Sequence, residues 1–262
     1  MKTVLITGGS SGIGFELSRY FAKAGYKMLW VSLTSQELNN AKIKLNSEFD
    51  NCNVDVLALN LAEANSGKTI YNWTKENGWN VNVLINNAGF GLFGFFEEMG
   101  LDRMKDMIGT NVLALIELSH YFLNDMNKRD EGTIINISSN SSFQPVPKMN
   151  IYASTKSFVS HFSRGLHEEL KLKGSKINII TVFPAPIKDT AFRKVNDMDN
   201  VKTFDGMAST TTSEVAKDIW NGFQKGKNIV VTGAKLRRLY AIKNLVPSKL
   251  TQYLVRKEIE TT

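Results

Sequence analysis

Cysteine is almost missing from this chain of 262 residues, in which Cys52 stands alone. A lone cysteine excludes an intrachain disulfide and a metal cluster built on cysteines, and it fits a reducing compartment. Long apolar runs are missing too, since none approaches the roughly 20 residues of a membrane span. The first strand-like run, Val4–Thr7, leads directly into Gly8 and Gly9 and leaves no room for a signal peptide. The sequence therefore predicts a cytoplasmic protein.

Histidine is scarce, and His120, His161 and His167 have no grouping with carboxylates or cysteines that resembles a metal site. No metal is therefore expected. Acidic residues are outnumbered 25 to 32 by basic ones, which gives a formal charge of +7. Most of the excess lies in the C-terminal tail, with basic residues at 235, 237, 238, 243, 249, 256 and 257 against acidic ones at 258 and 260. A chain that is close to neutral elsewhere is not expected to bind nucleic acid.

What the chain does have is a regular alternation of short apolar runs and amphipathic segments. The apolar runs predict strands over 2–7, 26–33, 54–61, 81–85, 133–137, 176–183 and 228–232. The amphipathic segments predict helices over 13–24, 35–49 (with Ser35 as N-cap), 66–77, 101–127, 152–172 and 213–225. This alternation is typical of an α/β fold, a doubly wound parallel sheet of about seven strands with helices on both faces. A single domain over 1–262 is the economical interpretation.

The first predicted strand ends in a glycine-rich turn, Gly8-x-x-x-Gly12-x-Gly14. Glycine lets the backbone approach a pyrophosphate closely, and the N-terminus of the following helix offers free N–H groups and a favourable dipole. A tight turn can also use glycine for purely steric reasons. The position of the turn favours a nucleotide site, because ligands of such sheets bind beyond the carboxyl ends of the strands.

A candidate catalytic group follows the fifth predicted strand, where Ser139 precedes Tyr152 and Lys156. Residues four apart share one face of a helix, and a lysine cation beside a tyrosine lowers the pKa of its phenol. The spacing alone is not specific, because Tyr71–Lys75 and Tyr253–Lys257 repeat it. Among the three pairs, only Tyr152 has a serine thirteen residues before it, at the end of a strand. That hydroxyl can hydrogen-bond the substrate oxygen that gains or loses the proton.

Five motifs follow one another along the chain. The motifs are Thr7-Gly8-x-x-x-Gly12-Ile13-Gly14, Asn86-Asn87-Ala88-Gly89, Asn111, Ser139 and Tyr152-x-x-x-Lys156. Together they resemble the short-chain dehydrogenase/reductase family over roughly residues 1–190. The resemblance implies a single-domain, Rossmann-like oxidoreductase that transfers hydride between NAD(P)(H) and a carbonyl or alcohol.

The resemblance also implies a role for each matching residue. Tyr152 would be the proton donor or acceptor, Lys156 would lower its pKa and hold the nicotinamide ribose, and Ser139 would orient the substrate oxygen. Asn111 would hold a proton-relay water, although a polar residue on a solvated helix face is the plainer interpretation of it alone. The implied cofactor contacts are Gly8, Ser10, Ser11, Gly12, Ile13, Gly14, Ser32, Leu33, Asn60, Leu61, Asn87, Ala88, Gly89, Tyr152, Lys156, Pro184, Ile187 and Thr190.

One departure from the family pattern concerns the choice between NAD and NADP. At the end of the second strand, Ser32 and Leu33 replace the aspartate of NAD-preferring members. The basic residues of NADP-preferring members are also missing. Ser32, Thr34 and Ser35 can hydrogen-bond a phosphate, which favours NADP.

Two other departures concern the adenine and the nicotinamide. Asn60 replaces an aspartate near the adenine, and its side-chain carbonyl can still accept a hydrogen bond. After the sixth strand, Asp189 stands where the family has threonine, and Thr190 follows one place later. The backbone of Ile187 can still meet the nicotinamide amide, but the shape of this loop is not fixed by the pattern.

The predicted substrate loops are apolar. The segment Phe90–Phe96 is aromatic, and 185–212 is predicted to be a lid over an apolar cavity, unless these phenylalanines pack as core beneath the loops. An apolar ketone, aldehyde or secondary alcohol is the expected substrate. The basic tail 234–262 is predicted to form two amphipathic helices divided by Pro247. Packing on the same domain is the preferred interpretation over a membrane contact, a cover for the substrate or a dimer interface.

The leading hypothesis is therefore an NADP-dependent carbonyl reductase or alcohol dehydrogenase that uses Tyr152 as general acid or base. The alternative is a nucleotide-binding sensor or partner-binding protein that has kept the fold without catalysis. The intact set of catalytic-type residues argues against that alternative. The long helical segments 101–127 and 152–172 are candidates for an interface, so a homodimer or homotetramer is expected.

Overall fold

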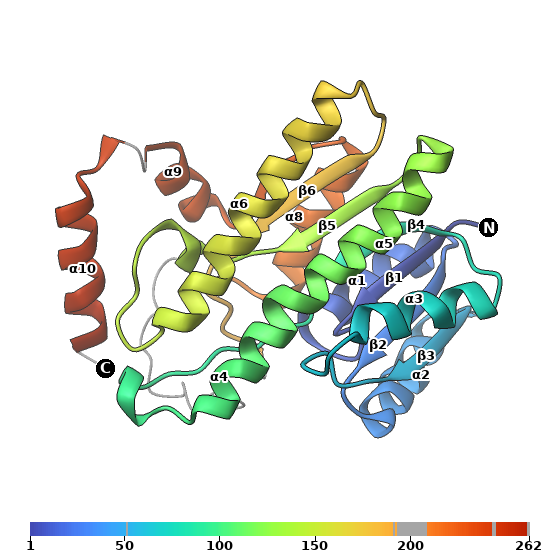
Figure 1. Ribbon diagram of the computed structural model, residues 1–262, viewed down its shortest axis with the longest axis horizontal. Coiled ribbons are helices and arrows are strands. Elements are labelled where there is room, and N and C mark those ends of the chain that lie inside the picture. Colours follow the sequence, from blue (N-terminus) through green and yellow to red (C-terminus); the bar gives the residue numbers. More distant parts are fainter. Residues whose placement is uncertain (51, 191, 193–208, 243–244, 261–262) are drawn as a thin grey trace.

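The computed structural model describes residues 1–50, 52–190, 192, 209–242 and 245–260, and it contains a seven-stranded parallel sheet (Figure 1). The strands are β1 (Thr3–Thr7), β2 (Lys27–Ser32), β3 (Val54–Ala58), β4 (Val81–Asn86), β5 (Thr133–Ile137), β6 (Asn178–Phe183) and β7 (Ile229–Val231). Their order across the sheet is β3-β2-β1-β4-β5-β6-β7, so the strand order reverses between β1 and β4. The predicted α/β fold with a doubly wound parallel sheet is confirmed.

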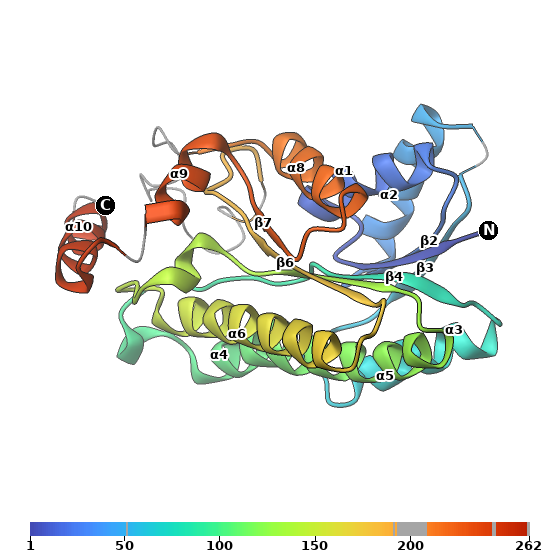
Figure 2. The same cartoon turned by 90° about the horizontal axis from the view of Figure 1, so that it is seen from above.

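Helices cover both faces of the sheet (Figure 2). One face carries α1 (Gly12–Lys23), α2 (Ser35–Glu48) and α8 (Thr212–Gln224). The other carries α3 (Ser66–Glu76), α4 (Leu101–Ile108), α5 (Ala114–Arg129) and α6 (Asn150–Leu172). The C-terminal helices α9 (Ala234–Ile242) and α10 (Ser248–Glu260) lie at the left end of the molecule in both views. No described helix is both long enough and apolar enough to pass through a membrane.

The core consists of two apolar layers, one on each face of the sheet. Successive side chains of a strand point to opposite faces. In β1, Val4 and Ile6 therefore belong to the layer that also holds side chains of α1, α2 and α8, and Leu5 belongs to the layer that holds side chains of α3 and α5. All three are fully buried. Because both faces are covered, the central strands are apolar at nearly every position instead of alternating.

The segment predicted as one helix over 101–127 is in fact α4 and α5 joined by a π-helical turn at Gly109–Leu113. The backbone of Gly109 passes so close to Ala62 that an added Cβ would lie 2.9 Å from the Ala62 carbonyl oxygen. Glycine is therefore needed at this position. Such a turn inserts one residue into a helix, which is too small a change for hydrophobic periodicity to reveal.

The predicted cap of α2 was wrong by one residue. Thr34, not Ser35, is the N-cap, because its side-chain oxygen accepts a hydrogen bond from the N–H of Glu37 at 3.3 Å. Two adjacent hydroxyl residues offer the same signal in the sequence, and only the backbone conformation distinguishes them. The predicted division of the tail at Pro247 is confirmed by the gap between α9 and α10.

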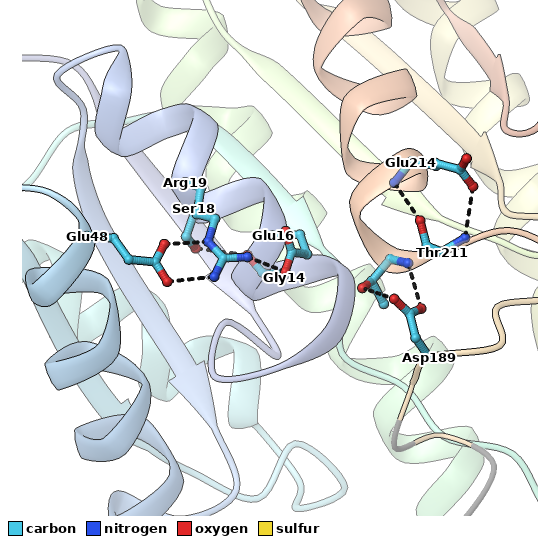
Figure 3. A network of polar contacts seen from close by, with 9 residues as sticks. Gly14, Glu16, Ser18, Arg19, Glu48, Asp189, Thr211 and Glu214 are labelled. Atoms are coloured by element: carbon cyan, nitrogen blue, oxygen red, sulfur yellow. Dashed lines mark hydrogen bonds and ion pairs between the residues drawn. The ribbon is translucent and has the colours of Figure 1, made fainter.

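The predicted lid over 185–212 belongs to the connection between β6 and α8, and its residues 191 and 193–208 lie outside the described residues. The Asp189 carboxylate accepts hydrogen bonds from the N–H and the hydroxyl of Thr212 at 2.8 and 3.2 Å, in the network of Figure 3. The unexpected aspartate thus ties the start of this connection to the N-terminus of α8.

Figure 3 also shows polar contacts at helix ends on the face of the sheet that α1, α2 and α8 cover. At the start of α8, the N–H of Glu214 donates to the Thr211 hydroxyl at 3.2 Å, and the N–H of Thr211 donates to the Glu214 carboxylate at 3.1 Å. This is the reciprocal capping box, which satisfies two otherwise unpaired donors. Arg19 of α1 donates to the Glu48 carboxylate through two N–H groups at 2.6 Å and so links α1 to the end of α2.

Candidate active site

A cavity of about 570 Å³ opens beyond the carboxyl ends of the strands, and it includes residues that follow both β1 and β4. Doubly wound sheets bind their ligands at this point, where the strand order reverses. The cavity is lined by every residue predicted to contact a cofactor except Gly14. Ser139, Tyr152 and Lys156 line it too, whereas Asn111 does not.

The glycine turn depends on backbone conformations and close approaches that only glycine allows. Gly8 and Gly12 have φ values of +67° and +54°. A Cβ at Gly14 would lie 2.2 Å from the Gly8 carbonyl oxygen, so a side chain there would break the turn. The N-cap of α1 is Ser11, whose side chain makes no capping hydrogen bond. The uncapped start of α1 therefore borders the cavity with N–H donors and a positive dipole end, which fits a pyrophosphate.

Thr7 joins this glycine turn to the loop after β4. Its hydroxyl oxygen accepts hydrogen bonds from the N–H groups of Asn87 and Ala88, both at 3.0 Å. Asn87 completes the link, because its side-chain amide donates to the carbonyl oxygens of Thr7 and Gly8 at 3.0 and 3.2 Å. The two loops that border the cavity at the reversal point are thus held in one geometry. The Asn87 amide nitrogen thus binds the protein backbone, while the residue also lines the cavity.

The end of the cavity next to β2 has hydroxyl groups and one carboxylate. The Ser10 and Ser32 hydroxyl groups are hydrogen-bonded to each other at 2.9 Å. Glu37, in the first turn of α2, lines the same cavity. The side-chain carbonyl of Asn60, expected to face an adenine, accepts a hydrogen bond from the N–H of Ala62 at 3.0 Å and so shapes its own loop.

The end of β5 and the start of α6 bring Ser139, Tyr152 and Lys156 together. Ser139 caps a short 3₁₀ turn, and its hydroxyl accepts a hydrogen bond from the N–H of Ser141 at 3.1 Å. The same hydroxyl donates to the Asn140 side-chain oxygen at 3.3 Å, and it lowers the pKa of the Tyr152 phenol. One helical turn later, the Lys156 Nζ lies 5.8 Å from the centre of the Tyr152 ring. All three side chains are buried, with exposed fractions of 5 to 9%.

Backbone contacts fix α6 against the end of β5. The Lys156 Nζ donates a hydrogen bond to the Ile137 carbonyl oxygen at 3.0 Å, and the Ser138 hydroxyl donates to the Lys156 carbonyl oxygen at 2.7 Å. Sequence reasoning did not single out Ser138. Its neighbour Ser139 has the same side chain and lines the same cavity, and only the hydrogen bond to Lys156 distinguishes Ser138.

Burial sets the pKa of both titratable groups. It raises the pKa of Tyr152 to about 12, against the smaller lowering effect of the Ser139 hydrogen bond, and it lowers the pKa of Lys156 to about 8. Both changes arise because a charged group loses its hydration in the protein interior. The expected lowering of the Tyr152 pKa by Lys156 is not found in the protein alone, where the ammonium binds a carbonyl instead of the phenol. The phenol is therefore protonated at neutral pH.

Asn111 lies inside the protein and not on a solvated helix face, with an exposed fraction of 2%. Its side-chain amide donates to the Phe90 carbonyl oxygen at 2.9 Å and to the Thr155 hydroxyl at 3.1 Å, and its carbonyl accepts from the Phe90 N–H at 3.1 Å. The π-helical turn of Gly109–Leu113 carries Asn111. It thereby ties the loop after β4 to α6, one residue before Lys156.

The part of the cavity around Tyr152 is largely apolar. Phe90, Val146, Met149 and Phe192 line the cavity and belong to one apolar cluster with Tyr152. Val255 and Ile259 are further apolar lining residues of the cavity. The Phe192 ring lies 5.5 Å from the ring of Tyr152. Within the aromatic loop 90–96, Phe90 lines the cavity whereas Phe95 and Phe96 are exposed, so the loop does not act as one unit. Two wall residues come from α10, a contribution that the preferred interpretation of the tail did not include.

Comparison with known protein families gives a match over most of the chain. The family model described as short chain dehydrogenase matches residues 2–200. The very-long-chain 3-oxoacyl-CoA reductase of Rattus norvegicus is 35% identical over an alignment of 211 residues, and the match covers 76% of this chain and 65% of that protein. The chain thus spans slightly less than two thirds of the length of this curated relative.

Two solved structures superpose on this fold. A short-chain dehydrogenase from Sphingobium yanoikuyae, in complex with NADPH, superposes with a TM-score of 0.79 at 28% identity and covers 88% of this chain and 87% of its own. A bulky-bulky ketone specific alcohol dehydrogenase from Comamonas testosteroni superposes with a TM-score of 0.74 at 26% identity, covering 88% of this chain and 86% of its own.

The buried ammonium of Lys156 predicts a pH dependence of stability. Its pKa falls from 10.5 in the unfolded chain to about 8 in the fold, so between these values the unfolded state binds more protons. The free energy of unfolding of the wild type should therefore rise, relative to that of Lys156→Met, as the pH increases from about 8 towards 10.5. Each pKa unit corresponds to about 1.4 kcal/mol, so the relative gain should be on the order of 3 kcal/mol.

Urea denaturation across this pH range measures the difference, in which the other titrating groups cancel. The matched control is Lys173→Met, at an exposed lysine, which should follow the wild-type profile. A constant difference between wild type and Lys156→Met would show that Lys156 has the same pKa in the folded and unfolded states.

Proposed function

The chain belongs to the short-chain dehydrogenase/reductase family of NAD(P)-dependent oxidoreductases, and we propose that it reduces apolar ketones or aldehydes with NADPH. In the reverse direction it would oxidise secondary alcohols. The observation that carries the proposal is the position of buried Ser139 and Tyr152. They line the apolar part of a cavity, and the glycine turn at the start of α1 borders the other part.

The residues around the cavity suit a nicotinamide dinucleotide. The glycine turn and the start of α1 would hold the pyrophosphate, and Ala88 and Gly89 would border the cofactor beyond it. Lys156 would bind the nicotinamide ribose, and the Pro184–Thr190 segment would cover the nicotinamide. When bound, the cofactor supplies the hydride. A side chain at Gly8 or Gly12 would be strained because both have positive φ, which supports a site kept free for a ligand.

Tyr152 is the proposed general acid. Its proton would move to the substrate oxygen as negative charge develops there, while the Ser139 hydroxyl donates a hydrogen bond to the same oxygen. The ammonium of Lys156, near the Tyr152 ring, would stabilise the phenolate that remains. Since burial raises the pKa of Tyr152 to about 12, the phenol holds its proton at neutral pH.

Asn111 is proposed to assist the return of a proton to Tyr152. It would hold a relay water near Lys156, as the family resemblance implies. The contacts that support a role at this place are those that its side chain makes with Phe90 and Thr155. Through them Asn111 also positions the loop after β4 beside the start of α6.

A preference for NADP over NAD is the finer proposal for the cofactor. The end of β2 has no carboxylate, and Ser32 lines the cavity with a hydroxyl group near the start of α2, whose dipole favours an anion. Glu37 lines the same cavity and opposes a phosphate. The preference for NADPH over NADH is therefore expected to be modest.

The proposed substrate is apolar and carries its carbonyl near Tyr152. The apolar wall made by Phe90, Met149, Phe192 and α10 supports this class. Relatives act on related compounds, since one is named for 3-oxoacyl-CoA and another for bulky ketones. We also propose that residues 1–262 form one domain.

Tyr152→Phe should abolish turnover and leave cofactor binding nearly intact. Loss of a general acid lowers kcat/KM by about 10²- to 10⁴-fold. The affinity for the cofactor should change little, because the glycine turn and Lys156 remain. Consumption of NADPH with an apolar ketone measures the first effect, and fluorescence titration with NADPH measures the second.

The matched control is Tyr253→Phe, which alters a tyrosine with the same spacing to a lysine on exposed α10 and should keep wild-type turnover. Wild-type turnover in Tyr152→Phe would remove Tyr152 from the mechanism. If the wild type itself consumes no cofactor with any carbonyl compound, a nucleotide-binding sensor becomes the better assignment.

Chain length should control substrate use. Each methylene group buried against an apolar wall contributes about 0.8 kcal/mol, so kcat/KM for a series of 3-oxo thioesters or methyl ketones should rise about fourfold per carbon until the cavity is full. Phe90→Ala should flatten this rise. Activity confined to small charged carbonyl compounds would contradict an apolar substrate.

The charge at position 33 should set the cofactor preference. Leu33 follows β2, lines the cavity and is 64% exposed, so the fold should tolerate changes there. Leu33→Arg should raise the ratio of kcat/KM with NADPH to that with NADH by roughly five- to tenfold, and Leu33→Asp should lower it by a similar factor. A wild type that prefers NADH would contradict the proposed NADP preference.

A further inference from the structure

The two C-terminal helices have exposed apolar side chains on their outer sides. Leu239 and Ile242 of α9 are 54 and 47% exposed, and Leu250, Tyr253 and Leu254 of α10 are 48 to 61% exposed. We call these five residues the tail face. Within each helix these side chains are three or four residues apart and therefore share one side of it. Exposed apolar groups of this kind mark surfaces that contact something other than water.

The inner sides of the same helices are already occupied. In α9, Leu236 is buried and Tyr240 packs against Phe183, with ring centres 5.6 Å apart. In α10, Val255 and Ile259 lie one turn apart and line the active-site cavity. Residues one helical turn apart share a face, so α10 cannot bring Tyr253 and Leu254 inwards without removing the cavity wall. The tail face therefore stays on the outside while the inner contacts exist.

Basic side chains lie on the same two helices as the tail face. Lys235, Arg238, Lys249 and Arg256 are exposed on the two helices. From residue 235 to the end, seven basic residues stand against two acidic ones, a difference of +5 out of the +7 of the whole chain. An apolar strip flanked by lysine and arginine is the pattern by which helices lie in the plane of a lipid surface. The exposed Phe95 and Phe96 are adjacent to Glu97 and Glu98, so that turn does not share the pattern.

We propose that the tail face binds the surface of an anionic lipid bilayer, with α9 and α10 lying in the interface. A helix of 13 residues is about 20 Å long, which is too short to span a bilayer but suits a position along its surface. Nucleic acid would use the basic residues but not the leucines. A second copy of the chain would bury the leucines but would bring two groups of the same charge together, which opposes association.

This surface contact is distinct from the proposed reaction, and it does not require that the protein be a reductase. It places one wall of the cavity, formed by Val255 and Ile259, on the inner side of the helix that would touch the bilayer. Binding to lipid and closure of the cavity would thus involve opposite faces of α10.

Sedimentation of the full chain with vesicles tests the proposal. We expect binding to vesicles of equal parts phosphatidylcholine and phosphatidylglycerol, weaker binding to pure phosphatidylcholine, and weakening by salt. Leu250→Ser with Leu254→Ser should reduce the affinity for the anionic vesicles by about tenfold or more. Lys249→Gln with Arg256→Gln should reduce it by roughly 25-fold, since each basic residue contributes a factor of about five.

Matched controls carry the same changes elsewhere on the surface. Ile43→Ser with Leu172→Ser alters two exposed apolar residues on other helices, and Lys68→Gln with Lys173→Gln removes two exposed charges. Both should bind vesicles as the wild type does, with unchanged midpoints of urea denaturation in all variants.

Three results would overturn the proposal. The first is a wild type that does not bind anionic vesicles. The second is an equal loss of binding in the tail and control variants, which would indicate a diffuse charge effect. The third is a wild-type dimer in sedimentation equilibrium that becomes a monomer in Leu250→Ser with Leu254→Ser, without vesicle binding by either, which would make the tail face a contact between copies of the chain.

Discussion

The hydrogen bonds of Thr7 are the constraint on which the whole site depends. A parallel sheet that reverses its strand order leaves a gap between the loops that follow β1 and β4, because their connections leave towards opposite faces. Thr7 closes that gap at its base by accepting the N–H groups of both Asn87 and Ala88, and Asn87 donates back to the glycine turn. The cavity is therefore bounded by two loops that are hydrogen-bonded to each other.

Burial determines the pKa values in the part of the cavity that contains Tyr152 and Lys156. Tyr152 and Lys156 face each other in an environment that opposes charge on either, so the protein alone presents a neutral phenol and an easily deprotonated amine. A titratable pair with such altered pKa values in a cavity is typical of a functional site. The same burial explains the backbone contacts of Lys156, since a buried ammonium needs an acceptor and takes the Ile137 carbonyl.

Much of this architecture could be predicted from local patterns, and the failures have a common cause. Strand and helix alternation predicted the sheet because burial on both faces demands apolar strands. The π-helical turn, the cap at Thr34 and the role of Asp189 could not be predicted. Each depends on a neighbour distant in sequence or on backbone geometry, such as Ala62 against Gly109 and Thr212 beside Asp189. Asn111 is a similar case, because its burial follows from a loop twenty-one residues away.

The sequence by itself determined the class of fold, the glycine turn and the order of Ser139, Tyr152 and Lys156, because periodicity and spacing are properties of a chain. The tertiary structure decided what these residues contact. It placed Lys156 on a backbone carbonyl, raised the pKa of Tyr152 by burial and made α10 part of the cavity wall. Solvent exclusion and long-range contacts arise only when distant segments meet, so no local pattern could specify them.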